Sequence, residues 1–141
     1  MFYSVINANN NYLIIYVIYF LNKITFAPNM ENFNSWDNLT IFLKKNFGID
    51  ENLQSILFLI GLQESGKGFK AYDQEEKTEI IKLAQIKLLA RENFYIPINV
   101  GNSNESGWIE NPNMSIPGEL VLEKLLKSLI LDYFNKQQFS N

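Results

Sequence analysis

The sequence predicts a small all-α domain of four helices, with a central apolar helix and a long loop before the last helix. Three observations lead to this prediction. Residues 53–62, LQSILFLIGL, are apolar almost throughout, as in a helix that other helices cover on every side. Asp73 and Glu76 have the spacing of a capping box, which marks a helix start. Residues 118–136 carry apolar side chains at three- and four-residue intervals, the period of an amphipathic helix.

Composition limits the chemistry that the chain can perform. The chain has 141 residues, 47% of them apolar, which is enough for one domain with a core. A net charge of −3 argues against a nucleic-acid surface. There is no cysteine and no histidine, so thiol chemistry and the commonest general base and metal ligand are missing. We therefore expect no cofactor and no metal site, and the composition favours a protein that is not an enzyme.

Residues 1–29 differ in character from the rest of the chain. They contain no acidic residue, no glycine and a single basic residue, Lys23. The favoured interpretation is that Met30 is the true start, so that 1–29 is upstream translation and 30–141 is a single helical domain in the cytoplasm. The alternative is a weak apolar anchor at residues 12–21, which would tether the protein to the inner membrane. That run is about half of the ~20 apolar residues that a spanning helix needs.

Cap residues place the expected helices along the chain. Ser35 is a favourable N-cap for the first, Asp50 for the central one, Asp73 for the third, and Ser115 for the last. The expected helices are 36–46, 53–62, 74–92 and 118–136.

The long loop is expected at residues 93–117. Pro97 blocks a helix there and favours a short extended segment around it, while the following residues up to 113 are rich in turn formers. A loop of this length is often functional. Its tryptophan, Trp108, has two interpretations that the sequence leaves open. It could anchor a partner, or it could fold back as a lid on the core.

One motif suggests nucleotide binding. Gly61, Gly66 and Lys67 match the G-x-x-x-x-G-K spacing of a phosphate-binding loop after an apolar run. The next residue should be Ser or Thr to hold Mg²⁺, but it is Gly68. The favoured interpretation is therefore a helix C-terminus closed by glycine.

Several of these segments together resemble a known family. The run ILFLIG followed by Gln63, Glu64 and Gly66, the Lys87–Leu89 segment and the Gly107-Trp108 turn are similar to a family of small helical proteins common in Bacteroidetes. The resemblance covers nearly all of 30–141. It implies a helical fold but no activity, and it implies that the glycines are kept without a phosphate-loop lysine.

The sequence thus favours a small, non-catalytic interaction or adaptor protein with a protein partner. The expected partner-binding residues are Gln63, Glu64, Gly66, Gly107 and Trp108. Two alternatives remain open at this point. One is a phosphate-loop-like nucleotide binder at 61–67, and the other is a membrane-anchored protein held by residues 12–21.

Overall fold

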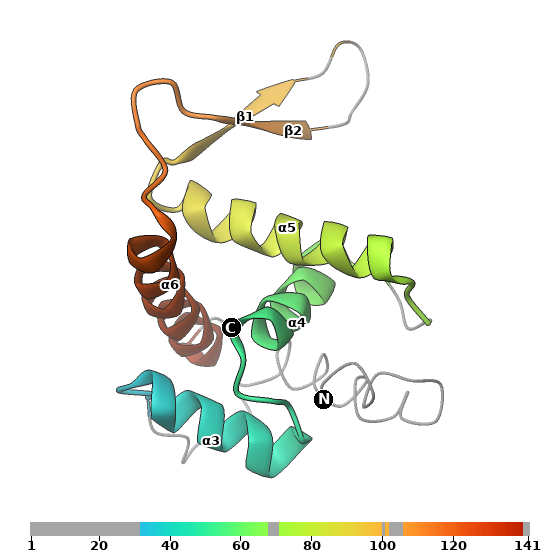
Figure 1. Cartoon of the computed structure of the whole chain (residues 1–141), viewed down its shortest axis with the longest axis vertical. Helices are drawn as coiled ribbons and strands as arrows, with labels where there is room; N and C mark the ends of the chain where they lie inside the picture. Colours follow the sequence, from blue (N-terminus) through green and yellow to red (C-terminus); the bar gives the residue numbers. More distant parts are fainter. Residues whose placement is uncertain (1–31, 68–70, 100, 102–105, 140–141) are drawn as a thin grey trace.

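The computed structural model describes residues 32–67, 71–99, 101 and 106–139. Within these ranges the chain forms helices and one hairpin (Figure 1). The elements are α3 (Trp36–Phe47), α4 (Leu53–Ser65), α5 (Gln74–Ala90), β1 (Tyr95–Asn99), β2 (Ser106–Glu110) and α6 (Glu119–Phe139). The expected start-site boundary at Met30 and the possible anchor at 12–21 lie outside the described residues, so both stay predictions.

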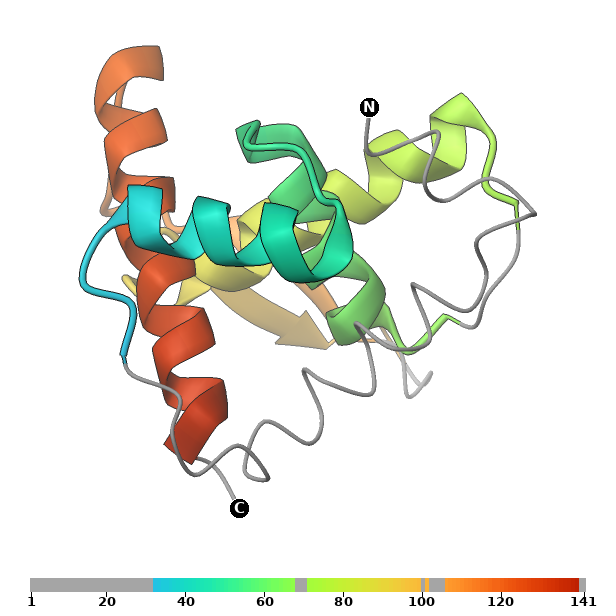
Figure 2. The ribbon, with the colours of Figure 1, turned by 90° about the horizontal axis from the view of Figure 1, so that it is seen from below.

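Helix α3 forms as its cap residues predict. The side chain of Ser35 accepts a hydrogen bond from the Asn38 amide at 3.1 Å, and Gly48 closes the helix in the left-handed region at φ 65°. Just before the helix, the Asn135 side chain of α6 binds both backbone groups of Phe33. It accepts from the Phe33 amide at 2.9 Å and donates to the Phe33 carbonyl at 3.0 Å. This pair ties the start of the described chain to the last helix. Figure 2 shows these two segments side by side.

Helix α4 is the central element and begins at Leu53 as expected, but its N-cap residue and its length differ from the prediction. Asn52, rather than Asp50, is the N-cap, because its side chain accepts the Ser55 amide at 2.7 Å. The helix continues past residue 62 to Ser65 and ends at Gly66, whose φ of 63° suits glycine. Residues from Ser55 to Leu62 are all buried, as expected for a helix covered on every side.

Helices α4 and α5 cross with their backbones close together at Gly61. A Cβ added to Gly61 would lie 2.2 Å from the Ile80 carbonyl oxygen and 2.6 Å from Ile80 Cγ2. Real side chains do not approach a backbone so closely, so only glycine fits at this crossing. Gly61 therefore sets how near the two helices come, and with it the positions of the side chains that flank the crossing.

Helix α5 begins and ends as its sequence dictates. The Asp73 side chain accepts the Glu76 amide at 2.8 Å, and the Glu76 side chain accepts the Asp73 amide at 3.0 Å, which confirms the expected capping box. After the helix, Asn93 adopts φ 64°. The Phe94 amide then donates to the Leu89 carbonyl at 3.1 Å, in a Schellman-type ending that turns the chain back over α5.

The expected loop at 93–117 contains a β-hairpin, so the all-α prediction is wrong for this segment. Strands β1 and β2 are antiparallel, with Ile96 opposite Ile109 and Pro97 opposite Trp108. Pro97 is tolerated because a two-stranded sheet leaves an edge on each strand. The backbone amide of Asn111 donates to the Phe94 carbonyl at 2.9 Å, and this bond closes the end of the hairpin opposite its turn. The extended segment around Pro97 is confirmed, whereas β2 was expected to be a turn.

Helix α6 packs across α3 and α5. It begins at Glu119, so the prediction of Ser115 as its cap is wrong; instead the Leu122 amide donates to the Gly118 carbonyl at 2.8 Å. Tyr133 and Phe134 on α6 are each 1% exposed and complete the core around α4. In Figure 1, α5 lies between α4 on one side and the hairpin on the other. Because α4 covers one side of α5 and the hairpin covers the other, α5 carries apolar residues on more than one face.

The Gly61 contact leads to a prediction about stability. Substituting Gly61→Ala should lower the free energy of unfolding by about 1–3 kcal/mol or more, because the new methyl group would force α4 and α5 apart. Helix propensity alone would change the stability in the opposite direction, by about 1 kcal/mol. Urea denaturation followed by circular dichroism measures the difference.

Gly118→Ala is the matched control for this experiment. A Cβ at Gly118 would meet no atom within 4 Å, so this variant should lose only the preference of a helix N-cap for glycine over alanine, about 0.5–1 kcal/mol. If Gly61→Ala proved as stable as the Gly118→Ala variant, the close crossing would not exist in solution.

Candidate functional site

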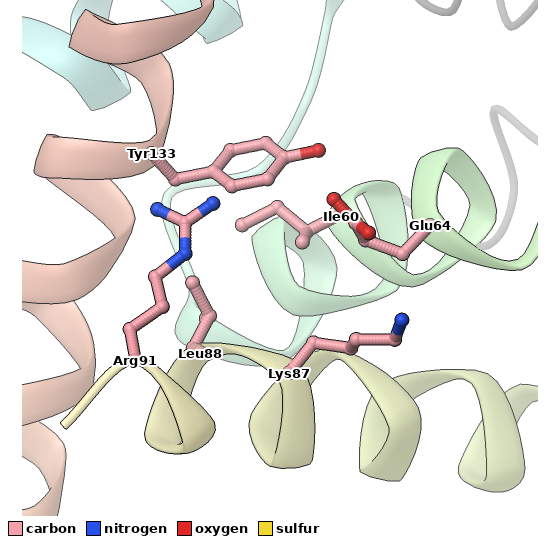
Figure 3. A pocket seen from close by; sticks show the side chains of 6 residues that line it. All are labelled: Ile60, Glu64, Lys87, Leu88, Arg91 and Tyr133. Atoms are coloured by element: carbon pink, nitrogen blue, oxygen red, sulfur yellow. The ribbon is translucent and has the colours of Figure 1, made fainter. Parts of the chain in front are cut away.

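A small pocket opens where α4, α5 and α6 meet (Figure 3). Its volume is about 90 Å³, well below the roughly 300–1,000 Å³ of typical small-molecule sites. It therefore suits one chemical group and a few waters rather than a whole cofactor. The pocket is lined by Ile60, Glu64, Lys87, Leu88, Arg91 and Tyr133.

The pocket combines an apolar floor with charged walls. Ile60 and Leu88 are at most 1% exposed and form the floor. Arg91 lies at one end and Glu64 at the other, as Figure 3 shows. Within the described part of the chain, no carboxylate lies within ion-pair distance of Arg91, and no cation lies within that distance of Glu64. Glu64 and Arg91 thus share the pocket without forming an ion pair with each other.

Aromatic rings position both cations of the pocket. The Arg91 guanidinium carbon lies 5.1 Å from the ring centre of Tyr133, and the Lys87 amine lies 5.5 Å from that of Trp108. Both distances are within the range of cation–π attraction. Lys87 thereby connects the pocket to the hairpin, because its side chain lines the pocket while its amine lies over a β2 residue.

The structure brings together two of the expected partner-binding residues through this lysine. Glu64 lines the pocket directly, and Trp108 lies against Lys87. Trp108 is half-buried, so it is neither a fully exposed anchor nor a closed lid. Gly107 pairs with Ile98 in the hairpin, one residue before Trp108. It belongs to the scaffold that holds the tryptophan.

The other expected residues are in the last turn of α4. Gln63 is half-buried within the helix, and Gly66 ends it. They therefore frame Glu64 instead of forming a separate polar turn. Neither lines the pocket.

The phosphate-loop pattern falls mostly within a helix. Gly61 is buried inside α4, where the approach of Ile80 explains its identity, and Gly66 is the left-handed C-cap. The Lys67 amide donates to the Ser65 hydroxyl at 3.3 Å. A phosphate-binding loop instead requires successive free amides that surround an anion. Each glycine of the motif thus has a structural explanation.

Lys87 and Arg91 were not expected as site residues, although their spacing in the sequence is unusual. The two are four residues apart on one face of α5, and like charges at that spacing repel. No Asp or Glu lies three or four residues from either one. The helix dipole favours cations at the C-terminal end of α5, so the only anomaly in this pattern is the mutual repulsion of the pair. Tyr133 gave no such signal, because its spacing is that of a core residue.

Other kinds of site are not found in the described ranges. Because the sequence has no His or Cys, Asp and Glu are the candidate metal ligands. Among the described residues, no group of three or more of them lies close enough together to hold a metal ion. Among the described helices, none is both long enough and apolar enough to cross a membrane.

Comparison of the chain with protein-family models, curated proteins and solved structures finds no match. The resemblance to the Bacteroidetes family therefore stays a prediction.

One tyrosine at the base of the hairpin has a perturbed acidity. Burial, and to a smaller extent the negative charge of Glu110 on the opposite strand, raise the pKa of Tyr95 above 10.0. Both causes favour the neutral phenol. The contribution of Tyr95 to stability is therefore present below pH ~10 and is lost as the pH rises through the folded-state pKa.

The register of the hairpin can be tested through this tyrosine. Glu110→Gln should lower the pKa of Tyr95 but leave it above that of a free tyrosine, because burial is the larger cause. NMR titration of the Tyr95 ring resonances measures the change. Glu119→Gln serves as the control and should have no effect. An unchanged Tyr95 pKa in the Glu110→Gln variant would contradict the pairing of these two residues.

Proposed function

We propose that the chain is a non-catalytic, cytoplasmic interaction protein that binds a protein partner over the surface joining Glu64, the pocket and Trp108. We call this the Glu64–Trp108 surface, and it comprises Glu64, Lys87, Arg91 and Trp108. The single observation that supports it is the position of Lys87, which lines the pocket beside Glu64 and lies over Trp108. Two features far apart in the sequence thereby share one surface.

The residue types favour binding over catalysis. The pocket contains no histidine or cysteine, the residue types used most often for acid–base and nucleophilic catalysis. Tryptophan and arginine are instead the residues most enriched at the energetic centres of protein interfaces. Both are present here, and a half-buried Trp108 can lose further exposed area when a partner covers it.

A variant-resolved capture experiment tests this proposal. The tagged full chain is incubated with lysate from the native type of cell, and bound proteins are quantified by mass spectrometry. One stoichiometric partner should be captured, and Trp108→Ala and Arg91→Gln should each reduce its capture by about tenfold or more, as expected for residues at an interface centre.

The control removes an exposed apolar residue from another face. Ile41 on α3 is 61% exposed, so Ile41→Ser should leave specific capture unchanged while reducing non-specific adhesion. Circular dichroism must show that each variant is folded. A partner lost with Ile41→Ser but kept with Trp108→Ala would place the interface elsewhere, and unfolding of Trp108→Ala alone would make Trp108 a structural residue.

A further inference from the structure

The pocket has an unequal charge distribution along its length. In Figure 3 the Lys87 amine points toward the end where Glu64 lies, whereas Arg91 occupies the opposite end. Lys87 and Glu64 therefore offset each other at longer range than an ion pair. No acidic residue lines the Arg91 end. The formal charge of the pocket is +1, from two cations and one carboxylate, and the excess lies on Arg91.

Arg91 is held in a geometry that suits recognition. Its guanidinium lies 5.1 Å from the ring centre of Tyr133, which is 1% exposed and therefore fixed in the core. A planar guanidinium held against a fixed ring is already restricted in its motion. It therefore loses less conformational entropy when its N–H groups bind a ligand. A guanidinium matches the two oxygens of a carboxylate in a paired, parallel geometry.

We propose that the pocket binds a single carboxylate from an acidic side chain of the partner protein, paired with Arg91. The methylene groups of that side chain would contact the apolar floor formed by Ile60 and Leu88, which lies next to Arg91. The inference rests on the proposed function, because the carboxylate is presented by the partner. It adds that the residue of the partner that enters the pocket is acidic.

The charge of the pocket distinguishes a carboxylate from a phosphate. A carboxylate carries one negative charge, which matches the excess on Arg91. A phosphate monoester carries about −1.5 to −2 at neutral pH, which exceeds the net charge of +1, and its second charge finds no further cation because Glu64 already offsets Lys87. Glu64 is half-buried, where screening by water is weaker than at the surface. Glu64 is thus a specificity-determining residue that favours ligands with one negative charge.

NMR titration of the full chain tests the proposal. The probe is N-acetyl-glutamic acid α-amide, which carries one side-chain carboxylate, at constant ionic strength up to its solubility limit. The Arg91 Nε–H and the Trp108 indole N–H are the reporters. The matched neutral probe is N-acetyl-glutamine α-amide, and inorganic phosphate tests the alternative anion. We expect a saturable shift of Arg91 Nε–H with the carboxylate probe and none with the neutral probe.

Substitutions in the pocket should change the affinity for the anions in predictable directions. Arg91→Gln should weaken carboxylate binding by about tenfold or more, since a hydrogen bond to a charged group is lost. Lys87→Gln should weaken it less. Glu64→Gln should strengthen binding of both anions and should strengthen phosphate more, because phosphate carries the greater charge. A merely structural Glu64 would not change this preference.

Several outcomes would overturn the proposal. These are an absent or non-saturable shift, an equal shift with the neutral probe, unchanged binding in a folded Arg91→Gln variant, or a wild-type preference for phosphate. The proposed function fails separately. If partner capture depends on Trp108 but no carboxylate binds, only this inference is wrong. If the carboxylate binds at Arg91 but no partner is captured, the pocket chemistry stands and the interaction role is wrong.

Discussion

The close crossing of α4 and α5 at Gly61 is the contact on which the other parts of the domain depend. Because the Ile80 backbone occupies the space that a Cβ would fill, α5 lies directly against the central helix. That crossing buries Ile80, Ala84 and Leu88 on α5 against a helix that is itself buried from Ser55 to Leu62. It also brings Glu64 at the end of α4 to the same pocket as Lys87.

The second constraint is the chain reversal at Asn93. Its left-handed conformation sends the chain back along α5, and Asn111 holds the base of the resulting hairpin through its bond to Phe94. The hairpin places Trp108 beside Lys87. The Glu64–Trp108 surface thus depends on two features of the backbone, a helix crossing that requires glycine and a turn that suits asparagine.

Local rules predicted much of the fold and little of the site. The helix signals at Ser35 and Asp73, and the glycine ends at Gly48 and Gly66, are short-range patterns that depend on neighbouring residues. Strand β2 was missed because Gly107 and the polar residues before it resemble a turn, and its pairing depends on β1. Glu64 and Trp108 were expected separately, but their link through Lys87 is a tertiary contact that no local pattern contains.

Amide hydrogen exchange in the wild-type chain and in the Gly61→Ala variant tests the dependence on the α4–α5 crossing most directly. In the wild type, the amides of residues 56–62 in α4 and 80–88 in α5 should exchange only through global opening, as buried central helices do. In the variant, protection should fall together in both helices and in the hairpin. Fast exchange in the wild-type α4, or loss of protection confined to one helix, would contradict the claim that this crossing organises the domain.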